Sequence, residues 1–132
     1  MSFIGGGPFS VTERILSSAE VLSLNTVPVE ILPAKAGVMY VPFFISVYKD
    51  AGTAYSVANM VLENASGIQF ASVPGVGFFD QSALAAYTQN FSGGQLKTLG
   101  KNLQLRLTSA ITTGNMPIRF KMIYIEEYPG LL

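Results

Sequence analysis

The side chains that most often carry chemistry near neutral pH are missing from this chain. Its 132 residues include no His, no Cys and no Trp. Imidazole and thiolate groups are common proton carriers, nucleophiles and transition-metal ligands. Carboxylates, lysines and hydroxyl groups remain as candidates, and their spacing decides what they could do.

The carboxylates and serines are badly spaced for catalysis. Acid–base work needs two carboxylates in one cleft, but Glu126 and Glu127 are neighbours on a predicted strand and point to opposite faces of a sheet. We expect the acidic residues to be solvated or ion-paired. Without histidine, a serine nucleophile needs a lysine base. The single Ser-x-x-Lys spacing, Ser46 to Lys49, lies at the end of a predicted strand, where residues three apart point to opposite faces. The sequence predicts that the protein is not an enzyme.

Ligand-binding motifs are equally weak. Gly5–Gly7 lacks the Gly-Lys-Ser/Thr sequel of a phosphate loop, and Gly75–Gly77 does not open a helix within a βαβ unit. No short stretch gathers the oxygen ligands of a calcium loop. Asn64 and Asn90 begin glycosylation triplets, but residues 1–8 are not typical of a secretory signal, so we expect chance matches. We predict no cofactor, no metal and no small-molecule substrate.

Aromatic side chains are the remaining candidates for binding, since the chain has nine Phe and six Tyr. One interpretation is a stacking platform for carbohydrate or bases. The interpretation we favour is a core with subunit contacts, where tyrosine offers an apolar face and a polar tip. The tyrosines considered for the platform are Tyr40, Tyr48, Tyr55 and Tyr87.

Composition favours assembly. Hydrophobic residues make up 49% of the chain and charged residues 12%, about half the usual charged share of a soluble domain. The formal net charge is zero, which favours self-association, and no basic cluster indicates nucleic acid. No apolar run approaches the roughly 20 residues that span a bilayer, so no membrane partner is expected.

Short strands broken by Gly and Pro predict an all-β, single-domain antiparallel β-sandwich, jelly-roll-like, with one or two short helices. Residues 38–47 are apolar on both faces, so both faces should be covered, and Pro42 indicates an edge or a bulge. Leu103, Leu105 and Leu107 alternate with polar residues, as in a half-buried strand. Further strands are expected at residues 27–32, 55–62 and 117–128, the last forming a C-terminal hairpin with 103–108.

Two helices are predicted from capping residues. Ser17 and Glu20 form a capping box before a short helical turn, and Asp80 would cap a helix over residues 80–88. Between them, residues 73–79 combine a loop-forming backbone with apolar side chains, which is typical of a contact surface. We expect residues 1–10 to form a flexible or subunit-contacting arm and residues 11–132 to form the sandwich.

Two stretches resemble small structural proteins of tailed bacteriophages. Residues 18–34 are similar to the opening of such proteins, and residues 114–124 are similar to their closing hairpin. The resemblance implies a small β-sandwich virion component, of the head decoration or cement type, often trimeric, or of the tail-adaptor type.

These observations together predict a virion structural protein, assembled in the host cytoplasm. It would act as a capsid cement or decoration subunit through oligomerisation, as a homotrimer, and through burial of apolar interface against the major capsid protein or other virion proteins. The alternative is a tail or fibre-base module that recognises a host glycan or docks another tail protein. The residues expected at the interfaces are Phe3, Ile4, Phe9, Tyr40, Phe43, Phe44, Val76, Phe78 and Phe79.

Overall fold

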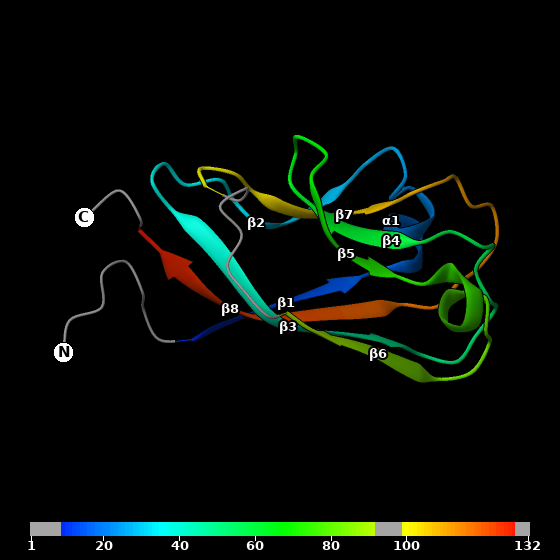
Figure 1. Cartoon of the computed structure of the whole chain (residues 1–132). Helices are drawn as coiled ribbons and strands as arrows, with labels where there is room; N and C mark the ends of the chain where they lie inside the picture. The colour runs from blue at the N-terminus through cyan, green and yellow to red at the C-terminus, as the bar shows by residue number, and fades with distance from the viewer. Residues whose placement is uncertain (1–8, 92–98, 129–132) are drawn as a thin grey trace.

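The computed structural model describes residues 9–91 and 99–128. Eight strands form two antiparallel four-stranded sheets that pack face to face (Figure 1). The first sheet, in spatial order, contains β1 (Ser10–Leu16), β8 (Ile118–Glu127), β3 (Met39–Lys49) and β6 (Ala85–Asn90). The second contains β2 (Val29–Leu32), β7 (Leu103–Leu107), β4 (Met60–Glu63) and β5 (Gln69–Val73).

The strand order follows from one long antiparallel ribbon. β1 pairs with β8, β2 with β7, β3 with β6 and β4 with β5, so the first half of the chain runs back along the second. Rolling this ribbon up places consecutive strands in opposite sheets, except β4 and β5, which share the second sheet, and adds the pairs β3–β8 and β4–β7. This is the jelly-roll arrangement, and it confirms the predicted all-β antiparallel sandwich.

The core lies between the sheets and comes from strand alternation. Residues that face each other across a strand pair point to the same side of the sheet, and the inward pairs of the first sheet include Ile45 with Met122 and Val47 with Phe120. The leucines of β7 and Leu62 of β4 face them, and all of these side chains are at most 2% exposed. The predicted alternation of β7 is therefore confirmed.

Local signals in the sequence also form as expected. Helix α1 (Ser18–Leu22) is capped by Ser17, whose hydroxyl accepts a hydrogen bond from the Glu20 N–H, while the Glu20 carboxylate accepts one from the Ser17 N–H. Pro42 lies at a register shift between β3 and β8, so the missing N–H falls at a bulge inside the sheet.

The predicted helix at residues 80–88 is wrong, because its backbone has other partners. The Asp80 carboxylate accepts a hydrogen bond at 2.7 Å from the N–H of Gly77, which precedes it in the chain, whereas a helix cap accepts from a residue that follows. The buried Lys49 ammonium donates hydrogen bonds to the carbonyl of Gln81, at 2.7 Å, and to the carbonyl of Ala83. In a helix these two carbonyls would accept hydrogen bonds from backbone N–H groups further along the chain. Because they accept from Lys49 instead, the segment stays extended and continues into β6.

The predicted C-terminal hairpin is also wrong. β7 pairs with β2 and β4, whereas β8 pairs with β1 and β3 in the other sheet. The alternation of apolar and polar residues identifies a half-buried strand, but it does not identify the strand that pairs with it. Residues 108–117 are long enough to cross the roughly 10 Å between packed sheets, and they do so.

The segment 55–59, predicted to belong to a strand, is an irregular approach to β4. Within it, Tyr55 is buried, and its hydroxyl donates to the Met116 carbonyl. This contact joins the start of β4 to the segment that crosses between the sheets.

The raised pKa of Tyr55 makes the stability of the fold decline at alkaline pH. Burial raises the pKa of Tyr55 to about 12, against 10 for an exposed phenol. The folded state keeps a proton that the unfolded state releases, so this contribution to stability is complete below pH 10 and is lost as the pH rises towards 12. Tyr55→Phe should lower the free energy of unfolding at pH 8 by about 1–3 kcal/mol, because the Met116 carbonyl loses its donor. It should also flatten the decline of stability from pH 10 to 12.

Urea unfolding at several pH values measures both effects. Tyr48→Phe is the matched control, since the Tyr48 side chain is 48% exposed, and it should change neither quantity. An unchanged alkaline slope in Tyr55→Phe would show that other groups cause the decline.

Candidate functional site: the outer face of one sheet

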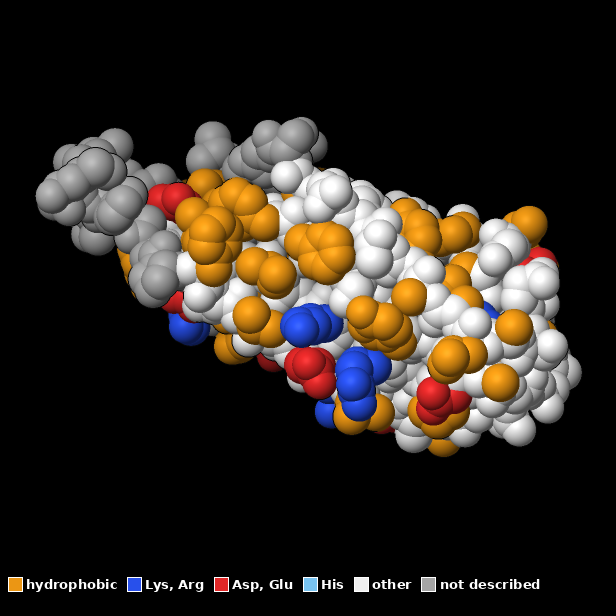
Figure 2. Space-filling view, turned by 90° about the horizontal axis from the view of Figure 1, so that it is seen from below, with side chains coloured by type: hydrophobic (Ala, Val, Ile, Leu, Met, Phe, Trp, Pro, Cys, Tyr) orange, Lys and Arg blue, Asp and Glu red, His pale blue; other side chains and the backbone are white. Residues whose placement is uncertain are grey.

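The two sheets differ in what they turn away from the core. Neither outer face is covered by the opposite sheet, so each would ordinarily be polar. The outer face of the first sheet instead carries large hydrophobic side chains. Figure 2 shows this face with hydrophobic groups gathered at both ends and a band of charged side chains between them.

One end of this face holds a cluster that we name the apolar patch. Val11 of β1 pairs with Ile123 of β8, and Ile123 in turn pairs with Phe44 of β3. Phe9, just before β1, stacks edge-on against Phe43 with ring centroids 4.9 Å apart. Phe9 is 65% exposed and Val11 57%, whereas the other three are half-buried. Large apolar groups left in contact with water in one cluster are typical of an interaction surface.

The middle of the face is charged. Glu13 pairs across the strands with Lys121, and it lies 3.7 Å from the Arg119 guanidinium. Both partners of this ion pair are about half exposed, so it adds little to stability. Exposed charges of this kind favour specificity over strength wherever they meet a partner.

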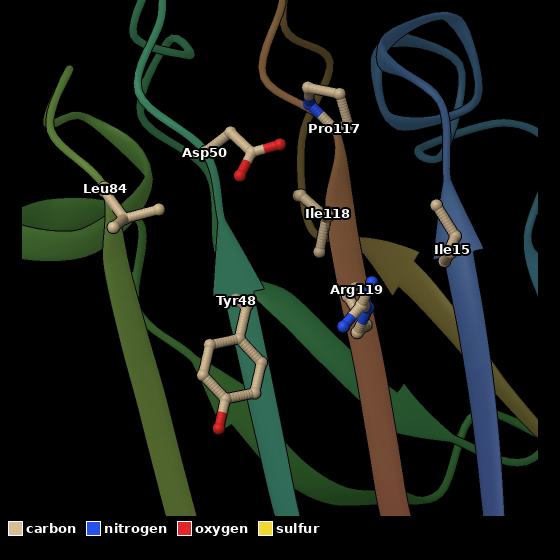
Figure 3. A pocket seen from close by; sticks show the side chains of 7 residues that line it. All are labelled: Ile15, Tyr48, Asp50, Leu84, Pro117, Ile118 and Arg119. Carbon is tan, nitrogen blue, oxygen red and sulfur yellow. The ribbon is translucent and has the colours of Figure 1, made fainter.

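The other end of the face contains an open pocket of about 270 Å³. Figure 3 shows Asp50, at the end of β3, between Leu84 and Pro117. Leu84 is 71% exposed and Ile15, on the opposite wall, 56%. The remaining lining residues are Tyr48, Ile118 and Arg119. The pocket is thus a second apolar area with charged groups at its border.

The outer face of the second sheet carries a network of polar side chains that are hydrogen-bonded to one another. Glu63 accepts two hydrogen bonds from Arg106, both at 3.0 Å, and one from Gln104 at 2.9 Å. Asn102 continues the network to Glu30 and Gln104. Burial alone would raise the pKa of Glu63, but the hydrogen bonds from Arg106 and Gln104 outweigh it and hold the pKa below its usual range. This face satisfies its own polar groups, in contrast to the apolar patch on the other sheet.

The expected interface residues separate into three groups. Phe9, Phe43 and Phe44 lie together in the apolar patch, and Val76 is 70% exposed on the turn η1 (Gly75–Phe79). Phe3 and Ile4 lie outside the described residues. The third group, Tyr40, Phe78 and Phe79, is at most 4% exposed.

The buried group corrects the expectation of a contact surface at these three residues. Phe78 and Phe79 turn into the core and pack on each other with ring centroids 4.8 Å apart, while Phe79 also packs on Tyr55. The turn can do this because Gly75 lies against the Ala58 backbone, where a Cβ would come within 2.5 Å of the carbonyl oxygen. Tyr40 packs on Tyr124 inside the sandwich. These side chains stabilise one subunit and leave almost no surface for another.

The tyrosine platform does not form. Tyr40 and Tyr55 are buried, while Tyr48 and Tyr87 point to opposite faces of the first sheet. The sequence signal that does lead to the surface is different: Val11, Glu13 and Ile15 alternate, and Ile123 and Ile125 stand where polar residues would be expected in a strand with one wet face.

Metal-binding clusters and membrane-spanning helices are both absent from the described residues. These residues contain no group of three or more acidic side chains arranged to hold a metal ion. No described helix has the length and apolarity needed to cross a membrane.

Comparison with known proteins finds a likeness in structure but none in sequence. No protein-family model matches it, and no curated protein matches it in sequence. A solved chain from the structure titled "Cyanophage Pam1 capsid asymmetric unit" is similar over 95% of this chain and 89% of that one. The TM-score is 0.54 and the sequence identity is 11%. At this identity the likeness shows a shared fold.

The apolar patch should drive association. We expect Val11→Glu to weaken self-association of the purified protein by at least about tenfold. Burial of a Val side chain contributes about 1.5–3 kcal/mol, and about 1.4 kcal/mol is a factor of ten. Sedimentation velocity over a range of concentrations measures the effect. Ser72→Glu, which adds the same charge on β5 of the other sheet, is the control. Wild-type protein that stays monomeric at micromolar concentration would contradict the role of the patch.

The polar network should be structural. Glu63→Gln removes the charge that Arg106 needs, so we expect a loss of about 1–3 kcal/mol in the free energy of unfolding at pH 7. Because the folded pKa of Glu63 is depressed, its contribution is present above the unfolded pKa of 4.5 and is lost as the pH falls through the folded pKa. The variant should therefore lose less stability on acidification, as measured by urea unfolding at pH 7 and pH 3. Self-association should not change, and a change would place the network in an interface.

Proposed function

We propose that this protein is a virion structural protein, a cement or decoration subunit that acts on the capsid of a tailed bacteriophage. Two observations support the proposal. The fold is shared, over nearly the whole chain, with a chain from a cyanophage capsid structure. The subunit also presents an apolar patch on one sheet and a closed polar network on the other. The second observation carries the proposal, because a one-sided apolar face is what a subunit needs to sit on a larger surface.

The proposed mechanism is interfacial burial. Apolar area removed from water contributes about 25 cal/mol per Å², which offsets the entropy lost when a subunit docks. In the proposed homotrimer, three weak contacts act together, so avidity raises the total affinity without stronger single sites. Glu13, Lys121 and Arg119 would select the register of the contact.

The proposed role involves no catalysis. Among the described residues, the acidic side chains that hydrogen-bond do so mostly within the subunit framework: Glu20 with Arg14, Glu63 with Arg106 and Glu126 with Lys35. A cement protein needs these side chains to hold shape, and its partners are other virion proteins, among them the major capsid protein.

Purified particles of the phage that encodes this chain test the proposal. We expect cryo-electron microscopy to find the subunit in many symmetry-related copies on the capsid shell. Capsids that lack it should open at lower temperature and regain their stability when purified protein is added back. Density confined to the tail would contradict the cement role and favour the tail-adaptor alternative. Particles without the chain would contradict any structural role in the virion.

A further inference from the structure

The four edge strands of the sandwich differ in how well they are protected. An unpaired edge exposes backbone donors and acceptors, and proteins usually block it with charges, proline, a bulge or a covering element. β1 carries Glu13 and Arg14 at its centre, and Arg14 is held 2.7 Å from Glu20 of α1. β2 has only four residues, contains Glu30 and is flanked by Pro28 and Pro33.

The other two edges lie in the stretch from residue 51 to residue 96, where Glu63 and Asp80 are the only charged residues. β5 has a register shift against β4, and its Ser72 carbonyl accepts from the Tyr87 hydroxyl at 3.4 Å. In the part of the chain that the structure describes, β6 has none of these devices. Its six residues, Ala-Ala-Tyr-Thr-Gln-Asn, contain no charge and no proline, and they pair with β3 without a shift. Figure 1 shows β6 at the border of the sheet.

The hydrogen bonds to β3 fix which backbone groups of β6 point outward. The Phe91 N–H donates to the Phe43 carbonyl at 2.9 Å, so these opposite residues form a bonded pair. Bonded and non-bonded pairs alternate along an antiparallel ladder, and Gln89 opposite Ile45 is therefore bonded as well. The backbone N–H and C=O groups of the residues between, Ala86, Thr88 and Asn90, face the free edge, and all three residues are exposed.

We propose that the free edge of β6 pairs with β6 of a second copy of this chain, in antiparallel orientation about a two-fold axis at Thr88. In this register Thr88 faces Thr88 of the other copy, and Ala86 faces Asn90 in both directions. Each of these three pairs exchanges two backbone hydrogen bonds, so every outward donor of the strand meets an acceptor. Threonines facing each other form a favourable cross-strand pair, and no like charges meet because the strand has none.

This contact and the proposed capsid role use different surfaces. The strand edge lies beside the sheet, whereas the apolar patch lies on its face, so one subunit can make both contacts. If the trimer forms through the face, pairing at β6 links neighbouring trimers into a continuous layer. The pairing itself concerns the isolated protein, and its test does not depend on the capsid.

A single engineered cysteine tests the pairing, because the natural chain has none. Facing residues in a bonded pair have Cα atoms about 5.5 Å apart, within the range of about 4.4–6.8 Å for a disulfide. Full-length Thr88→Cys treated with oxidised glutathione should give a dimer that reducing agent separates. Ser72→Cys, exposed on the edge strand β5 of the other sheet, is the matched control and should remain largely monomeric on a non-reducing gel. Equal cross-linking of the two variants would overturn the proposal.

A second variant tests the hydrogen bonds. Thr88→Pro removes an N–H that points away from β3, so the fold tolerates it better than a proline inside the ladder. We expect it to lose the two-fold contact, with at least a tenfold weaker dimer by sedimentation velocity, while Thr88→Val keeps it. Circular dichroism checks that both variants fold. If Thr88→Pro misfolds, the cysteine pair decides the outcome; if it folds and associates like the wild type, the proposal is wrong.

Discussion

The structure depends on the apolar layer between the two sheets. Each strand has one face that must leave water, and the rolled ribbon brings all of these faces together. The layer also takes in side chains from outside the strands, including Leu24 after α1, Phe78 and Phe79 from η1, and Tyr55. One subunit therefore hides much of its hydrophobic excess by itself. Part of what remains exposed gathers on one outer face, around Phe9 and Val11, while single side chains such as Val27 are exposed elsewhere. The gathered part makes a stable domain a candidate building block.

Period-two alternation and local capping predicted much of the fold. Leu103 to Leu107 could be assigned to a half-buried strand because each inward position is a leucine, and the Ser17–Glu20 box needs only local contacts. The partner of each strand was beyond such signals, since β7 and β8 each alternate but pair in different sheets. The extended segment after η1 depends on Lys49, 32 residues before the Gln81 carbonyl that it binds. Contacts at such separations leave no local pattern.

The candidate surface was predictable in kind but only partly in place. An apolar, weakly charged chain indicated association, and Phe9, Phe43 and Phe44 do lie in the exposed patch. Phe78 and Phe79 were misplaced because a Gly-rich loop with aromatic residues can turn outward or inward, and the close approach of Gly75 to Ala58 decides which. Val11 and Ile123 were not among the expected interface residues. The apolar Ile123, at a position of its strand where a polar residue was expected, did indicate that part of the outer face is covered.

The central claim is that association buries the outer face of the β1-β8-β3-β6 sheet and leaves the Glu63–Arg106 face in water. Hydrogen–deuterium exchange with side-chain carboxyl labelling, compared between the dilute and the assembled protein, measures this directly. The account predicts that assembly protects Glu13 and the backbone around Phe9–Val11, with no change around Glu30 on the opposite sheet. Protection of Glu30 and its neighbours, with Glu13 still reactive, would contradict it.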